Sequence, residues 1–291
     1  MTKPSQAQRL REILSEDTCH VMPCCWDGLS AKMIGDAGFR FSFMSGFAVS
    51  ASRIGAPDTG LISFGEMLDQ GRNICAATDI PIIGDGDTGY GNALNVRRTV
   101  EMYARAGFAA VMIEDQVAPK RCGHTKGKLV VDRAEAFNRI KAAVDAKEAG
   151  ADILILARTD ARHGHGLDEA IDRAKGFSDL GADMLFVEAP QSEAEMARLT
   201  REAPGIHMAN LVEGGATPIL HPDRLHELGY RFAAYPLTLL SATMKAIQDA
   251  LAVMARREHP ADLLLEFADL RKAAGFDAYY AAEQAYSDSR D

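Results

Sequence analysis

Residues 152–160, Asp-Ile-Leu-Ile-Leu-Ala-Arg-Thr-Asp, form an apolar run that ends in polar side chains. Residues 109–115, Ala-Ala-Val-Met-Ile-Glu-Asp, have the same form. Neither run alternates between apolar and polar residues, as a half-exposed strand would. Continuous apolar runs are typical of parallel strands that are covered on both faces of the sheet.

Eight such runs follow one another along the chain, and their last residues lie near positions 26, 45, 87, 115, 160, 189, 212 and 236. Amphipathic helical patterns separate them, and the clearest cover 28–38, 95–107, 133–150, 167–181 and 192–203. Eight strand–helix units predict an α/β fold, a (β/α)8 barrel of the TIM type. An open doubly wound sheet, which has fewer strands, is the alternative.

The chain has 291 residues, and single α/β barrels of about 250 residues are common. Because no linker or low-complexity stretch divides it, we expect residues 1–291 to form one barrel domain. A helical pattern over 237–258 completes the barrel, and a further helical stretch over 261–287 exceeds what a barrel needs. This C-terminal extension is therefore a candidate for contacts between subunits.

The composition excludes several classes of protein. There are 32 Lys+Arg and 41 Asp+Glu, a net charge of −9, and the pI is near 5.4. Nucleic acids and anionic membranes need clustered cations, so neither is an expected partner. No apolar run approaches the roughly 20 residues of a membrane span, and the N-terminus lacks the apolar segment of a signal peptide. An odd number of cysteines, 5, predicts a reducing, cytoplasmic setting.

Almost every predicted strand ends in a polar residue. The strand ends of such a barrel meet at one mouth, where its chemistry lies, so these side chains are expected to converge. Taken singly, Asp27 and Asp160 are better interpreted as N-caps of the following helices or as turn residues. The full set is Asp27, Ser45, Gly46, Asp85, Asp87, Glu114, Asp115, Arg158, Asp160, Glu188, Asn210 and Glu213.

Residues 84–91, Gly-Asp-Gly-Asp-Thr-Gly-Tyr-Gly, match the spacing of a dinucleotide-binding loop. Asp85 and Asp87 argue against that function, because both would direct negative charge at a pyrophosphate. Together with Glu114 they are better interpreted as oxygen ligands of Mg²⁺, which keeps several waters and few direct carboxylates. The lack of a histidine cluster makes Zn²⁺ unsuitable.

A long stretch, residues 117–131, follows the fourth strand, and Gly123 and Gly127 give it conformational freedom. Long loops at this end of a barrel are commonly lids over the site. Lys126 and Lys128 fit a solvated lid surface and a substrate contact equally well.

Within this stretch, Cys122 lies between the cations Lys120 and Arg121 and the histidine His124. Such surroundings stabilise a thiolate and make the sulfur available for chemistry. The remaining cysteines lie in apolar patterns and are interpreted as small buried hydrophobes; they are Cys19, Cys24, Cys25 and Cys75.

The segments KRCGH (120–124), DGDTGYG (85–91) and ILARTDA (155–161) together resemble the isocitrate lyase/phosphoenolpyruvate mutase superfamily. The likeness is greatest to its 2-methylisocitrate lyase and 2-alkylmalate (2,3-dimethylmalate) lyase branches, and it runs in register from about residue 8 to 255. It implies a Mg²⁺-dependent barrel, in which Mn²⁺ can substitute. It also implies a homotetramer, a dimer of dimers, with the C-terminal helix swapped between subunits.

Carried over by position, the resemblance makes Asp87 the direct Mg²⁺ ligand, with Asp58, Asp85 and Glu114 acting largely through water. It assigns Cys122 as the proton donor, in the company of Lys120, Arg121, Gly123 and His124. It places Arg158 and Glu188 among the catalytic residues, and gives substrate contacts to Ser45, Gly46, Phe47, Gly123, Arg158, Asn210 and Pro236.

The implied reaction is cleavage of the C2–C3 bond of a 2-hydroxy acid that chelates Mg²⁺. One product is a 2-oxo acid such as pyruvate. The other is a carbanion that Cys122 protonates as general acid.

Three departures from the 2-methylisocitrate lyase pattern narrow the substrate. Phe43 replaces a tyrosine, Val212 replaces a threonine, and Ser241 replaces an arginine that binds a third carboxylate. A tricarboxylate would then carry an unpaired buried charge, which is costly. We therefore expect a small dicarboxylate with alkyl groups, cleaved by a 2-alkylmalate or 2,3-dimethylmalate lyase.

Other functions stay open at this point. The nearest is an oxaloacetate decarboxylase or hydrolase on the same scaffold, followed by 2-methylisocitrate lyase. A phosphonate mutase fits less well, because that branch lacks the Cys-Gly-His motif. A catalytically silent barrel that serves as a binding protein is the most distant alternative.

Overall fold

The structure is a computed structural model, and it describes residues 4–121 and 127–287. The chain divides into two compact units, Met1–Leu239 and Leu240–Asp291. The first unit contains every strand and all the described residues predicted for the site, apart from Ser241.

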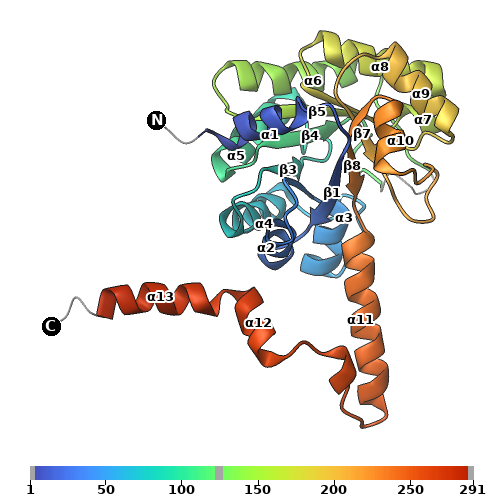
Figure 1. Cartoon of the computed structure of the whole chain (residues 1–291). Coiled ribbons are helices and arrows are strands. Elements are labelled where there is room, and N and C mark those ends of the chain that lie inside the picture. Colours follow the sequence, from blue (N-terminus) through green and yellow to red (C-terminus); the bar gives the residue numbers. More distant parts are fainter. Residues whose placement is uncertain (1–3, 122–126, 288–291) are drawn as a thin grey trace. The chain divides into compact units, whose positions relative to one another are not determined.

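The first unit is a closed barrel of eight parallel strands that pair in chain order, with β1 beside β8 (Figure 1). The predicted (β/α)8 barrel is confirmed, and the open doubly wound sheet is excluded. The strands are β1 His20–Cys25, β2 Ser42–Met44, β3 Ile82–Asp85, β4 Ala110–Glu114, β5 Leu154–Thr159, β6 Met184–Val187, β7 His207–Asn210 and β8 Tyr230–Tyr235.

Helices surround the strands, and most begin at a polar cap. Asp27 accepts a hydrogen bond from the Ser30 amide and forms a capping box, so its interpretation as a helix cap is confirmed. The helices of this unit are α1 Gln6–Leu14, α2 Gly28–Asp36, α3 Gly46–Val49, the π-helix η1 Ser50–Ile54, α4 Phe64–Ala77, α5 Ala93–Ala106, α6 Arg133–Glu148, α7 Ala161–His165, α8 Leu167–Asp179, α9 Glu193–Glu202 and α10 Pro222–Glu227.

Two apolar layers hold the barrel together. One lies between the strands and the outer helices and is rich in isoleucine, valine and alanine. The other fills the barrel interior and includes Met112, Phe186 and Phe232. Side chains alternate between the two faces along a strand, so the residues two positions after Met112 and Phe186 also point inward. Glu114 and Glu188 therefore stand at the mouth.

The first helix, α1, closes the N-terminal end of the barrel. Its apolar face, Ala7, Leu10, Ile13 and Leu14, is buried in the same cluster as the interior strand residues. The Ile13 carbonyl contacts the His20 ring at the start of β1, 3.0 Å away. The mouth at the strand carboxyl ends is therefore the face at which a small molecule can reach the interior.

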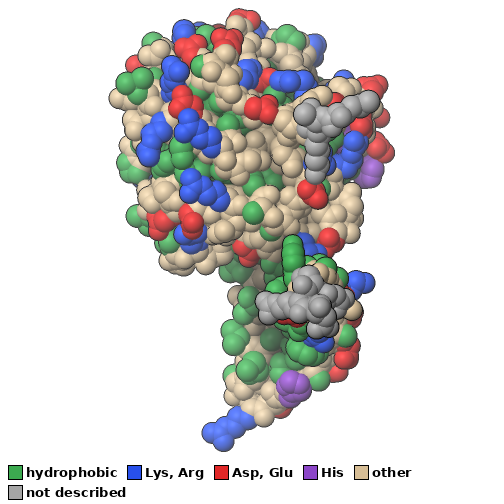
Figure 2. All heavy atoms as spheres, turned by 90° about the vertical axis from the view of Figure 1, so that its left-hand side faces the viewer, with side chains coloured by type: hydrophobic (Ala, Val, Ile, Leu, Met, Phe, Trp, Pro, Cys, Tyr) green, Lys and Arg blue, Asp and Glu red, His purple; other side chains and the backbone are tan. Residues whose placement is uncertain are grey.

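The second unit is helical. It begins within α11 Thr238–Ala255 and continues through the 3₁₀ turn η2 Ala261–Leu263, α12 Phe267–Ala274 and α13 Phe276–Ser287. The predicted helical stretch over 261–287 is thus interrupted, because Gly275 adopts the left-handed conformation, with φ 90°, between α12 and α13. Apolar side chains are exposed along this unit (Figure 2): Met244, Ile247, Leu251, Met254, Leu263, Leu264, Leu265, Phe267, Leu270, Phe276, Tyr279, Tyr280 and Tyr286.

Over the barrel surface, cationic and anionic side chains are interspersed and form no single basic face in this view (Figure 2). Within residues 4–121 and 127–287, no helix combines the length and the apolar character that a bilayer crossing requires.

Candidate active site

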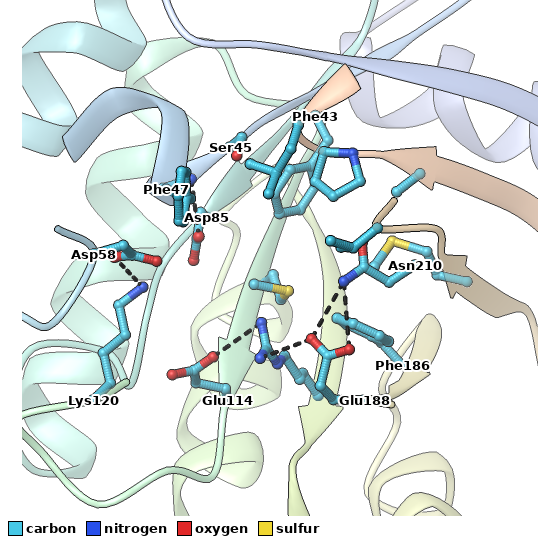
Figure 3. A pocket seen from close by; sticks show the side chains of 18 of the residues that line it. Phe43, Ser45, Phe47, Asp58, Asp85, Glu114, Lys120, Phe186, Glu188 and Asn210 are labelled. Atoms are coloured by element: carbon cyan, nitrogen blue, oxygen red, sulfur yellow. Dashed lines mark hydrogen bonds and ion pairs between the residues drawn. The ribbon is translucent and has the colours of Figure 1, made fainter. Parts of the chain in front are cut away.

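A cavity of about 240 Å³ lies at the mouth of the barrel (Figure 3). Its size suits a small molecule, because cavities for drug-sized ligands span roughly 300–1,000 Å³. Cys122, Gly123 and His124 lie outside the described residues, and Asp87 lies just beyond the lining. Four of the polar strand-end residues, Asp27, Asp115, Asp160 and Glu213, do not line the cavity, and Glu213 is exposed and hydrogen-bonded to Thr238. The remaining predicted site residues line it: Ser45, Gly46, Phe47, Asp58, Asp85, Glu114, Lys120, Arg121, Arg158, Glu188, Asn210 and Pro236.

Asp85, the last residue of β3, is held by two backbone amides. The amide of Asp87 donates to Oδ1 at 3.0 Å, and the amide of Gly46 donates to Oδ2 at 3.1 Å. A β-carbon at Gly46 would overlap Oδ2, so this approach requires glycine. The Gly46 amide is therefore directed at Asp85 in this structure, and not at the cavity.

Lys120 lies between two buried carboxylates. Its Nζ is 2.6 Å from Asp58 Oδ1 and 2.7 Å from Asp87 Oδ1, and all three side chains are buried. Asp87 adopts the left-handed conformation, with φ 48°, which costs a non-glycine residue about 1–3 kcal/mol and recurs at functional sites. Lys120, predicted to flank a reactive cysteine, is thus part of the acidic cluster itself.

The cluster carries more negative than positive charge, and the pKa values respond to it. Burial raises the pKa of Asp87 to about 7, against the attraction of Lys120. Burial also raises the pKa of Glu114 well above its ordinary range, although Arg158 opposes this. Burial alone would lower the pKa of Lys120, but Asp87, Asp85 and the other carboxylates raise it well above its usual value.

Arg158, on β5, is surrounded by carboxylates. It donates to both oxygens of Asp160, from Nε at 2.8 Å and from Nη2 at 3.1 Å. Its Nη1 lies 3.3 Å from Glu114 Oε2, and its Nη2 lies 3.0 Å from Glu188 Oε2. Phe186 lies under the guanidinium, 5.0 Å from the ring centroid. Asp160 occupies the N-cap position of α7, as predicted, but its side chain makes no cap hydrogen bond and binds Arg158 instead.

Asp160 is fixed from behind by a second set of contacts. Its backbone amide donates to Asp115 Oδ1 at 2.9 Å, and Arg173 Nη1 lies 3.0 Å from Asp115 Oδ2. Lys128 Nζ lies 2.8 Å from Asp160 Oδ1, with both side chains buried. The interpretation of Lys128 as a solvated lid surface is wrong, because this side chain is buried and pairs with Asp160; a contact of Lys128 with the substrate stays a prediction. Lys126 lies outside the described residues.

The stretch predicted to be a lid is joined to itself at its base. Val117 donates to the Leu129 carbonyl at 2.8 Å, and Gln116 and Val130 form an antiparallel bridge. This pairing brings Lys120 and Lys128 back toward the mouth, where each meets a carboxylate. These contacts involve the two described ends of the stretch, residues 117–121 and 127–131.

Opposite the charged residues, the cavity wall is apolar. Phe43, Val212 and Leu237 belong to this wall, and so do Met112, Phe186, Met208, Ala234 and Pro236. Asn210 lies at its edge and donates to Glu188 at 3.3–3.4 Å. In Figure 3, Asp58, Asp85 and Lys120 lie on the left of the cavity with Phe47, and Phe43 and Phe186 lie on the right, where Asn210 and Glu188 are also found. Ser241 belongs to the second unit, so its predicted effect on the substrate stays a prediction.

Four cysteines are packing residues, as predicted. Cys19, Cys24 and Cys25 are buried and Cys75 is partly buried. Burial raises the pKa of Cys19, Cys25 and Cys75 to about 12, so these thiols are poor nucleophiles near neutral pH.

The sequence pattern of the phosphoenolpyruvate phosphomutase family matches residues 10–255. The chain belongs to this family. It is 40% identical to 2,3-dimethylmalate lyase of Eubacterium barkeri, over 98% of this chain and 99% of that protein.

Solved structures agree with this membership. A structure of 2,3-dimethylmalate lyase, described as a PEP mutase/isocitrate lyase superfamily member, has a TM-score of 0.92 at 35% identity, and covers 98% of this chain and 96% of its own. Oxaloacetate acetylhydrolase in complex with 3,3-difluorooxalacetate also has a TM-score of 0.92, at 33% identity, with 97% of each chain covered. The predicted superfamily is confirmed. The Eubacterium barkeri relative, which matches this chain over nearly its whole length, is named a lyase.

A solved structure similar to this chain contains a metal: phosphonopyruvate hydrolase in complex with oxalate and Mg²⁺, with a TM-score of 0.86 at 28% identity, covering 97% of this chain and 99% of that one. In this chain, among the described residues, no three Asp, Glu, His or Cys side chains converge as a ready-made metal site. Mg²⁺ does not require such a group, because it takes one or two carboxylates and keeps its waters.

The donor set nonetheless fits a hard divalent cation. Asp58 Oδ1 and Asp87 Oδ1 are buried oxygens whose described partner is Lys120 Nζ, and Glu114 Oε1 is buried and receives no hydrogen bond from a described residue. Buried polar atoms of this kind are rare in proteins and need a reason. A cation that accepts carboxylate oxygens and water would supply one.

Sequence reasoning missed the residues that support the site from behind. Asp160 was interpreted as a cap, and Arg173, which contacts Asp115, was not singled out at all. A charged residue on an amphipathic helix gives no sign that it faces the barrel. The apolar wall could have been found, since Met112, Phe186 and Met208 each lie two residues before a polar strand end.

Proposed function

We propose that this protein is a Mg²⁺-dependent carbon–carbon lyase that cleaves a 2-alkylmalate or 2,3-dimethylmalate. The products would be a 2-oxo acid such as pyruvate and a short carboxylic acid. The observation that carries the proposal is the division of the cavity into a charged side, at Asp85 and Lys120, and an apolar side, at Phe43 and Val212. A substrate with carboxylates at one end and methyl groups at the other complements both.

The small number of cations in the cavity supports a substrate with two carboxylates over one with three. Among the described lining residues the cations are Lys120, Arg121 and Arg158. Arg158 already contacts three carboxylates and Lys120 contacts two. A third substrate carboxylate would face the apolar wall, where a charge without a partner is costly. Full-length likeness to 2,3-dimethylmalate lyase supports the same conclusion.

Asp87 would hold the cation directly, and Asp58, Asp85 and Glu114 would hold its waters. When bound, a divalent cation stabilises negative charge on oxygen as a Lewis acid. The rest of the chemistry falls to the protein. Asp85 is positioned by two backbone amides and needs no reorganisation.

The remaining steps assign roles to other residues. Ser45 and Phe47 would contact the 2-oxygen end of the substrate, and Arg158, fixed by Asp160, would orient a carboxylate. Cleavage removes the proton of the C2 hydroxyl, breaks the C2–C3 bond and adds a proton at C3. We assign that last proton to the Cys122 thiol, with Glu188 and Asn210 beside the reacting carbons.

The test is an assay of 2-oxo acid release over a panel of substrates. We expect turnover of 2,3-dimethylmalate or a 2-alkylmalate to exceed turnover of 2-methylisocitrate and isocitrate. Activity should disappear with a chelator and return with Mg²⁺ or Mn²⁺. Preference for a tricarboxylate would overturn the argument from the apolar wall.

Oxaloacetate hydrolysis or decarboxylation is the second candidate, favoured by the likeness to oxaloacetate acetylhydrolase. The smallness of the cavity also suits oxaloacetate. Cys122→Ser separates the two functions. In the lyase, removing the proton donor should lower turnover at least about 10²-fold, whereas decarboxylation of oxaloacetate needs no thiol. Full activity of the variant on oxaloacetate would favour the second candidate.

The oligomeric state belongs to the same proposal. We propose a homotetramer in which residues 261–287 contact a neighbouring subunit. The support is the row of exposed apolar residues in the second unit, because large exposed apolar patches mark interaction sites. A cytoplasmic setting and a chain of one barrel domain plus this extension remain predictions from the sequence.

A further inference from the structure

We propose that the Lys120 ammonium occupies the position of the divalent cation when no metal is bound. There it neutralises Asp58 and Asp87, and the metal cation binds by displacing it. This inference rests on the proposed function, since it takes the metal site from there. What it adds is a competition within the chain that sets the affinity for metal and the order of binding.

The first observation is the position of the ammonium. Lys120 Nζ lies 2.6 Å from Asp58 Oδ1 and 2.7 Å from Asp87 Oδ1, two of the residues proposed for the metal site. These side chains are only 5–6% exposed. A second cation cannot approach both oxygens while Nζ remains there, because like charges at such distances repel strongly in a buried site.

The second observation is that Nζ is the main described partner of these two oxygens. Apart from Lys120, no described residue donates a hydrogen bond to Asp58 Oδ1 or to Asp87 Oδ1. When Nζ leaves, both buried oxygens lose this partner. They are then available as ligands to the cation that replaces the ammonium.

The third observation is the charge balance. Asp58, Asp85, Asp87 and Glu114 all act on the single charge of Lys120. Glu114 Oε1 is buried and receives no hydrogen bond from a described residue. One positive charge leaves this cluster negative, and a divalent cation neutralises it further. Exchange of Nζ for the cation is therefore favourable for the carboxylates, and the ammonium is a weak competitor that the cation can displace.

Displacement has a consequence for the substrate. Lysine carries its charge on a flexible four-carbon stem, so Nζ can leave the carboxylates while the backbone of Lys120 stays in place. Lys120 lines the cavity, and the released ammonium would meet an anionic substrate there. Metal binding would thus release the Lys120 ammonium to bind the substrate. The expected order of binding is therefore metal first and substrate second.

The test compares Mn²⁺ binding, measured by electron paramagnetic resonance without substrate, in the wild type and in Lys120→Met. If Nζ occupies the site in nine of ten molecules or more, the variant should bind Mn²⁺ about tenfold more tightly or better. Lys128→Met is the matched control. It removes a buried lysine from the same stretch, but one that contacts Asp160, so its Mn²⁺ affinity should be unchanged.

A second measurement on the wild type requires no variant to fold. Acetylation of lysines, followed by mass spectrometry, should show Lys120 protected without metal and labelled several-fold faster with Mg²⁺. Lys128 should be protected in both states.

The outcomes are distinguishable. Equal Mn²⁺ affinity in wild type and Lys120→Met would overturn the competition while leaving the metal site intact. Lys120 labelling that does not respond to Mg²⁺ would also overturn the competition. Tighter Mn²⁺ binding by Lys120→Met would then be explained by the loss of one positive charge, without displacement of Nζ. Absence of Mn²⁺ binding to either protein would remove the metal from the proposed function, and this inference with it.

Discussion

Gly46 and Asp85 are in direct contact: the Gly46 amide donates a 3.1 Å hydrogen bond to Asp85 Oδ2, and no side chain fits between them. The contact joins the start of α3, which follows β2, to the end of β3. Together with the Asp87 amide, it holds a carboxylate of the proposed metal site by backbone groups.

Substitution of Gly46 by alanine should therefore act through Asp85. The added β-carbon would overlap Oδ2 and push the carboxylate away. Displacements of about 1 Å at a catalytic group can cost on the order of 10²-fold in rate, so kcat/KM for the preferred substrate should fall by about that factor. Gly164→Ala, where a β-carbon meets nothing within 4 Å, is the control and should retain activity. Unchanged kinetics of Gly46→Ala would mean that Asp85 can move without penalty.

Asp160→Asn should destabilise the fold. The substitution removes the carboxylate charge that Arg158 and Lys128 share in a buried setting. Breaking a buried ion pair from one side costs about 3–5 kcal/mol, and urea unfolding should show a loss of that order. Asp168→Asn removes an exposed carboxylate that pairs with Arg198, and its effect should stay within about 0.5 kcal/mol. Similar effects of the two substitutions would contradict the importance given to the Asp160 contacts.

His207 should make stability depend on pH. Burial lowers the pKa of its imidazole, although a hydrogen bond to the Ala203 carbonyl opposes this. The unfolded chain then binds a proton at a higher pH than the native protein does. The stability contribution is present above the ordinary histidine pKa of 6.5 and is lost as the pH falls below it.

The measurement is the urea midpoint at several pH values between about 7.5 and 5. His207→Gln, which does not titrate, should lose less stability over this range than the wild type. Other groups contribute to both proteins, among them His20, whose pKa burial also lowers. Parallel curves for the two proteins would show that His207 is not protonated in this range on unfolding.

A charge on the apolar stripe of α11 should disrupt the assembly. Met244, Ile247, Leu251 and Met254 follow helical spacing and are half exposed or more. Leu251→Glu would place a charge within the exposed apolar side chains of the second unit that support the proposed subunit contact, so light scattering should show a smaller species at the same concentration. Ala242→Glu adds the same charge at an exposed position on the opposite face of α11 and should leave the mass unchanged. A wild-type monomer would refute the proposed tetramer outright.

The barrel could be predicted from the sequence because its two signals are local. Continuous apolar runs such as 109–115 indicate buried parallel strands, and the amphipathic patterns between them indicate helices. The strand-end positions of Glu114, Arg158 and Glu188 followed at once, since the carboxyl ends of parallel strands share one rim.

The partners of these residues could not be predicted in the same way. Whether the Asp160 side chain caps the next helix or binds Arg158 depends on its side-chain torsion angles, and both orientations are compatible with the sequence. Lys120 and Lys128 come from a stretch without periodicity, so nothing local indicates which side faces inward. Only the pairing of 117 with 129 across that stretch brings each lysine to a carboxylate.

α1 closes the N-terminal end of the barrel with four apolar side chains. A cleavage reaction turns one bound molecule into two, and both fragments must depart through the opening by which the substrate entered. Their release is then sequential. The fragment nearer the opening leaves first, and while it stays it blocks both its companion and the next substrate. Product inhibition patterns for this enzyme should accordingly be those of an ordered uni-bi reaction.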